Sequence, residues 1–511
     1  MQTSEIKSLL SNVLPAVDFD ADFLFAELDS LGVATILYVL SEKYDIFLTS
    51  EDVTPKNFRS IDSLTALVNS RMSLENKIRQ FSVKTPDKVA VMCEGGQMTY
   101  SELWAAILER AEKLRGEGLL ARRPYVFRAS QDIDFLVTYC AVHYLDAVAV
   151  PLEHKVSDAN FNAVKDEVDA YTFPSGIVDT LYTTGSTGKS KGVMLSRTCL
   201  DACADNFISD LNFNRDLLFI ISGPLNHIAS LFKIHPTLCA GGTLYILDGL
   251  KDMNAFFKVF DLPFKQFGTF LVPASIRLIM QFSYERLCAL APKIAFIETG
   301  AAPITHPEME QLSRALPHSH LYNTYGGTEI GCVAAYDFND GKYMEGCVGR
   351  PLKNSAVEIS PEGTVVVSGS VIMSGYLNDE EGTRRVIRDG KIHLSDLGYF
   401  DSEGLLHLTG RSDDVLNVGG YKVNPLEVEN AAAEFPGVKD CICVCTQHPV
   451  IGPVLKLVLQ VENEDGFNSR SLAAFLKERL DAYKVPAVYE VAPIRYTFNG
   501  KKDRKSYKEV K

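Results

Sequence analysis

The stretch LYTTGSTGKSKGVML, from Leu181 to Leu195, decides how this chain is interpreted. Its apolar start predicts a strand that ends in a turn rich in glycines, hydroxyls and lysines. Backbone N–H groups at glycines, together with hydroxyls and a lysine, are the groups that wrap a polyphosphate. The stretch therefore predicts a phosphate-binding loop, and a polar turn without a ligand is the alternative.

The turn is close to a Walker loop, which requires G-x-x-x-x-G-K-S/T. Counting back from Gly188 places Thr183 where the first glycine of that motif belongs. The missing glycine argues against a P-loop NTPase, because it is needed for the backbone shape of the loop. A P-loop NTPase stays open at this point, since the segment TLYILD, ending at Asp248, is a candidate Walker B strand.

Composition and charge exclude several classes of protein. A chain of 511 residues predicts several globular domains, and its start lacks the basic and apolar regions of a signal peptide. No window holds 18 uncharged apolar residues, so no membrane insertion is expected. The 11 cysteines lack the spacing of a disulfide framework, which predicts a reducing, cytoplasmic location. The net charge of −14 argues against nucleic-acid binding.

Three further motifs follow the loop along the chain. YNTYGGTE (Tyr322–Glu329) joins an aromatic residue, a glycine turn and an acid. HLSDLGYFDSEGLLHLTGRSDDVLNVGGYKVNPLEVE (His393–Glu429) contains an acid, an arginine and an acid pair, and FNGKKDR (Phe498–Arg504) places a lysine after a glycine. The four ordered motifs resemble the adenylate-forming superfamily of acyl-CoA synthetases, peptide-synthetase adenylation domains and luciferases. The resemblance covers about residues 72–511.

The resemblance implies a multidomain fold. A large α/β adenylation body is expected over residues 72–411, followed by a small α+β C-terminal lid over residues 412–511. Asp413 is the expected hinge. The lid is expected to turn about it between two half-reactions, which removes Lys501 from the pocket.

The resemblance also implies roles that make chemical sense. A carboxylate must approach an anionic triphosphate, so like charges have to be neutralised and aligned. Three residues are the expected catalytic groups: Lys191 reaches the β and γ phosphates, Glu329 binds Mg²⁺, and Lys501 lies between the carboxylate and the α-phosphate. The residues expected to bind ATP are Thr183, Thr184, Gly185, Ser186, Thr187, Gly188, Gly300, Ala301, Ala302, Asn323, Thr324, Tyr325, Gly326, Thr328, Asp396 and Arg411.

Within that set, Tyr325 is expected to stack on adenine and Asp396 to accept both ribose hydroxyls. Two residues depart from the pattern of the family. Ser190 stands where the family usually has proline, and Ser395 stands where it usually has glycine. The segment between Pro151 and Leu181 is short for the family, which suggests a trimmed substrate-side region.

The first 71 residues form a separate, acidic region with 11 acidic and 5 basic side chains. Helices are predicted from Lys7 to Pro15, from near Ser30, and from Ile61 to Ser70. The region resembles an acyl carrier protein, an all-α bundle of four-helix type. Its Asp-Ser-Leu motif would carry 4′-phosphopantetheine on Ser30, and a serine that only caps a helix is the alternative. A linker is predicted from Ser70 to about Lys77.

The sequence says least about the substrate. Peptide-synthetase domains for α-amino acids usually place an aspartate against the amine, but residues 217–247 contain no Asp or Glu. An unpaired α-ammonium in a pocket would cost several kcal/mol, as an uncompensated buried ion does. A fatty or aryl acid is therefore expected. His227, Ser230 and Gly327 are the candidate pocket residues, with His227 at its mouth.

The resulting hypothesis is ATP- and Mg²⁺-dependent activation of a carboxylic acid as its adenylate, followed by transfer to phosphopantetheine on Ser30, as in nonribosomal peptide or polyketide biosynthesis. It implies a phosphopantetheinyl transferase and a downstream synthase or acyltransferase as partners. The alternatives are an acyl-CoA ligase that uses free CoA, an amino-acid-activating initiation module, and a non-catalytic carrier scaffold.

Overall fold

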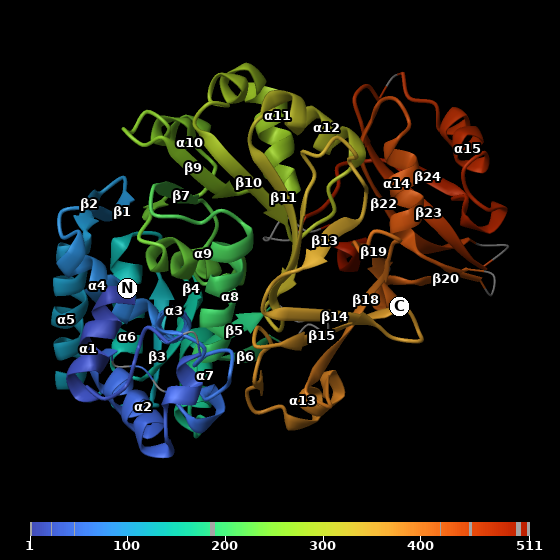
Figure 1. The fold of residues 1–511 in the computed structure, drawn as a ribbon. Coiled ribbons are helices and arrows are strands. Elements are labelled where there is room, and N and C mark those ends of the chain that lie inside the picture. Colours follow the sequence, from blue (N-terminus) through green and yellow to red (C-terminus); the bar gives the residue numbers. More distant parts are fainter. Residues whose placement is uncertain are drawn as a thin grey trace. The chain divides into compact units, whose positions relative to one another are not determined.

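The computed structural model describes residues 3–21, 23–44, 46, 48–183, 190–418, 421–448, 452–464, 466–496 and 502–507. The chain forms two compact units, Met1–Gly249 and Leu250–Lys511, whose elements are labelled in Figure 1. Six of the predicted site residues lie outside the described residues: Thr184, Gly185, Ser186, Thr187, Gly188 and Lys501.

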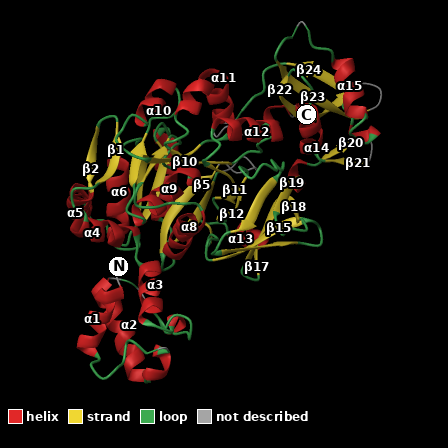
Figure 2. Cartoon of the chain, turned by 45° about the horizontal axis from the view of Figure 1, so that its top comes forward, coloured by secondary structure: helices red, strands yellow, loops and turns green. Residues whose placement is uncertain are grey.

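The N-terminal region is all-helical where it is described, as predicted. Its helices pack on one another in Figure 2. Pairs of apolar residues four positions apart, such as Ile36 and Leu40, give each helix one buried face. All residues of this core lie within residues 6–72. The first helix begins at Thr3, four residues before the predicted Lys7. The elements are α1 (Thr3–Val13), η1 (Leu24–Glu27), α2 (Ser30–Tyr44), η2 (Ser50–Asp52) and α3 (Ile61–Arg71).

The connection that follows the bundle is much shorter than predicted. Helix α3 runs to Arg71 and α4 (Leu74–Lys84) begins three residues later. Met72 is 7% exposed within the core of the bundle, and the Ser73 side chain accepts a hydrogen bond from the N–H of Asn76 at 3.2 Å. The linker predicted from Ser70 to Lys77 is therefore wrong, because both helices extend into it.

The rest of the first unit contains two sheets. In one, the strand order is β2-β1-β8-β7, with β1, β8 and β7 parallel. In the other, β3, β4 and β5 are parallel and β6 is antiparallel. The elements are β1 (Val89–Cys93), β2 (Gly96–Thr99), α5 (Tyr100–Gly116), β3 (Pro124–Ala129), α6 (Ile133–Tyr144), β4 (Val148–Glu153), α7 (Asp158–Asp169), β5 (Ile177–Thr183), β6 (Lys191–Ser196), α8 (Arg197–Asp210), β7 (Leu217–Ile221), α9 (Ile228–Cys239) and β8 (Thr243–Ile246).

The second unit begins with parallel strands and continues as an antiparallel sheet. Strands β9, β10 and β11 are parallel, and the order continues as β12-β13-β19-β18-β15-β14 with antiparallel neighbours. The elements are α10 (Met253–Val259), β9 (Gln266–Phe270), α11 (Pro273–Ala289), β10 (Ile294–Gly300), α12 (His306–Ala315), β11 (His320–Gly327), β12 (Gly331–Asp337), β13 (Cys347–Pro351), β14 (Ser355–Ile359), β15 (Thr364–Gly369), β16 (Gly375–Tyr376), α13 (Glu380–Val386), β17 (Ile387–Arg388), β18 (Lys391–Phe400) and β19 (Leu406–Arg411).

The C-terminal part of this unit has α+β character, as predicted, and a core of its own that includes Val428, Leu457 and Leu472. Strands β22, β23 and β24 form one sheet, and β20 pairs with β21. The elements are η3 (Ser412–Asp414), β20 (Leu416–Val418), β21 (Tyr421–Val423), α14 (Pro425–Ala433), β22 (Val438–His448), β23 (Gly452–Val461), α15 (Ser469–Lys477), η4 (Ala482–Lys484), β24 (Val488–Val491) and η5 (Arg504–Tyr507). The proposed boundaries at residues 71 and 411 stay predictions.

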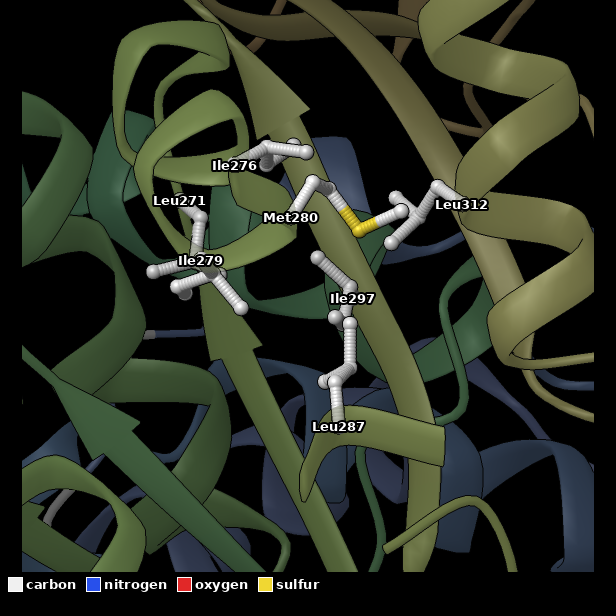
Figure 3. Close-up of a pocket in the computed structure, with 7 residues that line it drawn as sticks. All are labelled: Leu271, Ile276, Ile279, Met280, Leu287, Ile297 and Leu312. Atoms are coloured by element: carbon white, nitrogen blue, oxygen red, sulfur yellow. The ribbon is translucent and has the colours of Figure 1, made fainter. Parts of the chain in front are cut away.

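A small apolar pocket lies in the second unit, where α11 and α12 meet strands β9 and β10 (Figure 3). It leaves no room even for a water molecule, and its lining contains no charged side chain. We therefore assign it to the packing of the core rather than to a substrate. The lining residues are Leu271, Ile276, Ile279, Met280, Leu287, Ile297 and Leu312.

Two properties expected from composition can be compared with the structure. No helix among the described residues is both long and apolar enough to cross a bilayer. All 11 cysteines are free thiols.

Candidate active site

The predicted nucleotide residues gather where two parallel strands of the second unit end. Gly300, the last residue of β10, pairs with Thr324 of β11. A Cβ atom on Gly300 would lie 2.7 Å from the Thr324 carbonyl oxygen, so only glycine allows this approach. The carboxyl ends of parallel strands are where open α/β sheets commonly bind ligands. The neighbouring Ala301 adopts φ of 65°, a backbone conformation that non-glycine residues seldom adopt.

Tyr325, Asp396 and Arg411 come from three different strands and meet. The Tyr325 hydroxyl donates a hydrogen bond to Asp396 Oδ2 at 2.8 Å, and Arg411 Nη1 lies 3.8 Å from Asp396 Oδ1. Asp396 and Arg411 are direct partners in the β18–β19 register. Burial, and then the Asp396 charge, raise the pKa of Tyr325 well above its ordinary value, so the phenol stays a donor. Asp396 and Arg411 follow Tyr325 by 71 and 86 positions in the sequence, and the structure brings the three side chains together.

Glu329 follows the tight turn at the end of β11. The turn needs glycine at Gly326, because a Cβ there would lie 2.3 Å from the Gly331 carbonyl oxygen. The Tyr376 hydroxyl donates a hydrogen bond to Glu329 Oε1 at 3.1 Å. Tyr376 was not among the predicted site residues, because the segment SGYLND that contains it carries no chemical motif.

Two predicted ATP-binding residues make buried contacts inside the protein. The Asn323 amide donates to the Cys347 carbonyl oxygen at 2.7 Å, and the Thr324 hydroxyl donates to Glu298 Oε1 at 2.9 Å. Both residues are less than 9% exposed. In this structure these contacts fix the end of β11, and contact with ATP stays a prediction.

The described ends of the glycine-rich loop lie side by side in the first unit. Thr183 and Lys191 are register partners in the β5–β6 pair. The Ser190 hydroxyl donates a hydrogen bond to the Thr183 carbonyl oxygen at 2.8 Å. Ser190, which stands where the family usually has proline, therefore supplies a hydrogen bond to Thr183 that a proline side chain cannot make.

His227 directly precedes helix α9, whose first turn includes the buried Ser230. A Cβ on Gly223 would lie 2.5 Å from the Ser230 hydroxyl oxygen, so Ser230 packs against the loop before the helix. Gln131, which sequence reasoning missed, donates to the Gly223 carbonyl oxygen at 2.8 Å. Burial lowers the pKa of His227, although the charge of Glu153 acts in the opposite direction. The lowered pKa favours a neutral imidazole. The pocket role of these residues stays a prediction.

Two basic residues that follow Lys501 in the chain, Lys502 and Arg504, are held by contacts with β22 and α14. Lys502 Nζ lies 2.7 Å from Asp440 Oδ1, and its backbone forms an isolated bridge with Tyr496. Arg504 makes a two-pronged ion pair with Glu429, at 2.6 and 2.9 Å. The side chain of the predicted hinge residue, Asp413, lies 3.4 Å from Arg411 Nη2.

The predicted attachment residue, Ser30, is the first residue of α2 and is exposed. Asp29, rather than Ser30, caps the helix: its carboxylate accepts from the Gly32 N–H at 2.7 Å and its carbonyl oxygen from the Val33 N–H at 3.0 Å. The alternative that Ser30 is only a helix cap is therefore wrong. Among the described residues, the Ser30 hydroxyl has no hydrogen-bond partner.

Known proteins are similar to this chain in sequence and in fold. Residues 165–377 match the AMP-binding enzyme family. A feruloyl-CoA synthase from an Amycolatopsis species is 27% identical over 463 residues, covering 80% of this chain and 92% of that protein. The AMP-binding match spans Lys191, Tyr325 and Glu329, and it ends at Leu377, before Asp396 and Arg411.

Solved structures show the same fold. ATP-bound MatB from Rhodopseudomonas palustris superposes with a TM-score of 0.77 at 22% identity, over 86% of this chain and 99% of that one. The O-succinylbenzoate coenzyme A synthetase MenE from Bacillus subtilis, in complex with ATP and magnesium, gives a TM-score of 0.72 at 21% identity, over 85% and 99%.

Proposed function

We propose that this protein is an adenylate-forming acid–thiol ligase. It activates a small carboxylic acid with ATP and then transfers the acyl group to a thiol. The observation that carries the proposal is the cluster of Tyr325, Asp396 and Arg411 at the strand ends. An aromatic face, a carboxylate and a guanidinium at one place suit the base, ribose and phosphate of a nucleotide. The AMP-binding family match supports the same conclusion.

In the first half-reaction a carboxylate oxygen of the acid attacks the α-phosphorus of ATP, and pyrophosphate leaves. Asp396 accepts the ribose hydroxyls, because a carboxylate has about four acceptor sites and Tyr325 uses one of them. Lys501 places its ammonium between the two anions, and Lys191 neutralises the departing phosphates. In the second half-reaction a thiolate attacks the acyl carbonyl carbon, and AMP leaves.

Mg²⁺ fits the residues on the nucleotide side. Among the described residues no group of three or more His, Cys, Asp or Glu could form an all-protein metal site. Mg²⁺ is commonly held by one or two carboxylates together with substrate phosphates and water, which is what Glu329 alone can support. When bound, the cation supplies positive charge to the phosphate oxygens of ATP.

The comparisons favour free CoA as the thiol acceptor over a carrier. The feruloyl-CoA synthase and the O-succinylbenzoate coenzyme A synthetase are both named for a CoA product. We therefore place the acyl-CoA ligase reaction first. Lid rotation about Asp413, which removes Lys501 between the half-reactions, belongs to this proposal.

A fused carrier is the second candidate, and one specific observation favours it. Ser30 lies exposed at the first turn of α2 with its hydroxyl unused, while Asp29 provides the cap. The helix N-terminus there favours an anion such as a phosphodiester. In this variant a phosphopantetheinyl transferase modifies Ser30, and a downstream synthase or acyltransferase accepts the acyl group.

Covalent loading separates the two acceptors. The protein is treated with a phosphopantetheinyl transferase and CoA, freed of CoA, and then supplied with ATP, Mg²⁺ and acid. If CoA is the acceptor, intact-mass measurement finds no acyl adduct, and acyl-CoA forms only when CoA is added back. An acyl-phosphopantetheine adduct that Ser30→Ala abolishes would establish the carrier instead. Ser4→Ala, which changes an exposed serine in the first turn of α1, is the matched control.

The absence of acidic residues from 217–247 predicts which acids are activated. We expect acid-dependent ATP–pyrophosphate exchange with aryl or fatty acids that exceeds exchange with standard L-amino acids by at least about tenfold, because an unpaired ammonium in the pocket costs more than 1.4 kcal/mol. The measurement compares a panel of both classes at equal concentration. Faster exchange with an L-amino acid than with every aryl or fatty acid would contradict this expectation.

A further inference from the structure

Glu329 is held at two points by one short segment of the second unit. Its carbonyl oxygen accepts a hydrogen bond from the N–H of Met373 at 2.8 Å. Its side-chain Oε1 accepts the Tyr376 hydroxyl at 3.1 Å. Among the described residues, no hydrogen-bond or ion-pair partner occupies Glu329 Oε2. One carboxylate oxygen is therefore fixed and the other remains available to a ligand.

Tyr376 is itself fixed in place. Its N–H donates to the Thr383 hydroxyl at 2.9 Å, and that hydroxyl donates to the Asp379 carbonyl oxygen at 2.8 Å. The Tyr376 residue is only 8% exposed. A carboxylate oxygen can only accept, so the Tyr376 hydroxyl is the donor in its hydrogen bond to Glu329.

We propose that Tyr376 is a positioning residue, which orients the Glu329 carboxylate so that Oε2 binds the divalent cation of the ATP complex. This inference rests on the proposed function and adds to it a residue outside the nucleotide motifs. Hydrogen-bond partners of metal-binding carboxylates fix the orientation of the ligand. Their loss typically costs about 10- to 100-fold in metal affinity.

The test measures cation binding rather than turnover. Mn²⁺ is titrated into protein saturated with an ATP analogue whose α–β bridging oxygen is replaced by methylene, and binding is followed by water-proton relaxation. Tyr376→Phe removes one hydroxyl and keeps the ring. We expect it to raise the half-saturating Mn²⁺ concentration about 10- to 100-fold, and Glu329→Gln to raise it at least as much.

Tyr336→Phe is a closely matched control. The Tyr336 hydroxyl donates to the Asp340 carboxylate at 3.0 Å, and the residue is 6% exposed, so the deleted group has the same chemistry and burial. It lies outside the proposed site, and its Mn²⁺ titration should match that of the wild type within about twofold. Thr383→Val, which removes the hydroxyl that accepts the Tyr376 N–H, should shift the titration in the same direction and keeps the test available if Tyr376→Phe does not fold.

Each contrary outcome has a separate meaning. If Glu329→Gln weakens Mn²⁺ binding but Tyr376→Phe and Thr383→Val do not, the positioning role is overturned while the proposed function stands. If Glu329→Gln has no effect, the cation is not held by Glu329 and the inference falls with that assignment. If the wild-type protein binds no ATP analogue at all, the proposed function itself is overturned.

Discussion

Lys501→Ala should slow adenylate formation by about 10²- to 10³-fold and leave thioester formation from supplied acyl-adenylate within a few-fold of wild type. Removing one preorganised charge from the site of a developing anion has an effect of this size. The second half-reaction needs no such charge if the lid has turned. ATP–pyrophosphate exchange reports the first half-reaction, and acyl-CoA release from synthetic acyl-adenylate reports the second.

Lys439→Ala is the matched control for this variant. Lys439 is an exposed lysine of β22 in the same C-terminal part, so its removal changes the net charge equally. Lys502 is unsuitable, because its ammonium already pairs with Asp440. If Lys501→Ala slows both half-reactions equally, two separate lid positions are not needed and the hinge proposal at Asp413 fails.

The second large effect is expected at a buried ion network in the first unit. Glu75 Oε2 accepts from Arg197 at 3.0 Å, and Glu75 Oε1 lies 3.4 Å from His143 Nδ1. His143 Nε2 lies 2.8 Å from Asp179, whose other oxygen accepts the Tyr139 hydroxyl at 2.8 Å. These contacts join α4, which follows the bundle directly, to α6, α8 and the strand that leads into the glycine-rich loop.

Glu75→Ala should lower the unfolding free energy of the first unit by about 3–5 kcal/mol, because it leaves Arg197 and a buried His143 without their shared counter-charge. The measurement is the shift in the urea midpoint of the transition assigned to that unit. Asp134→Ala is the control. The Asp134 side chain is 64% exposed, so its ion pair with Arg110 should contribute less than about 1 kcal/mol. Equal effects of the two variants would contradict the assigned importance of the network.

The same network predicts a pH dependence of known sign. Burial alone would lower the pKa of His143, but Asp179 and Glu75 override it and raise the pKa from 6.5 to about 9. Tyr139 and the buried His235 also face this group, and burial keeps His235 neutral by lowering its pKa to about 4. The stabilisation is complete below pH 6.5 and is lost as pH rises through about 9. This stabilisation amounts to about 3 kcal/mol. The unfolding free energy of His143→Gln should therefore not show the loss between pH 6.5 and about 9.

The sequence predicted the parts of the site that belong to local motifs. Tyr325, Asp396 and Arg411 were each expected at the nucleotide, and the structure joins them through one carboxylate. The α/β body, the α+β C-terminal part and the helical N-terminal region were also expected. The body and the C-terminal part were implied by the resemblance that the four ordered motifs carry, and the N-terminal helices were predicted from the residues themselves.

What was missed depends on pairs of residues far apart in the chain. Tyr376 reaches Glu329 across 47 positions, and only Glu329 belongs to one of the quoted motifs. Glu75, His143 and Asp179 lie in three separate segments, so their burial together could not be read from spacing. The linker predicted from Ser70 to Lys77 is wrong for a local reason instead, because Ser73 caps a helix that starts at Leu74.

Oxygen-18 transfer tests the central claim most directly. The protein is given ATP, Mg²⁺, CoA and an acid labelled with ¹⁸O in both carboxylate oxygens. If a carboxylate oxygen attacks the α-phosphorus and the thiol then displaces AMP from the carbonyl carbon, each AMP formed must carry one ¹⁸O and the pyrophosphate none. Label in inorganic phosphate with ADP as the other product, or AMP without label, would contradict adenylate formation by this protein.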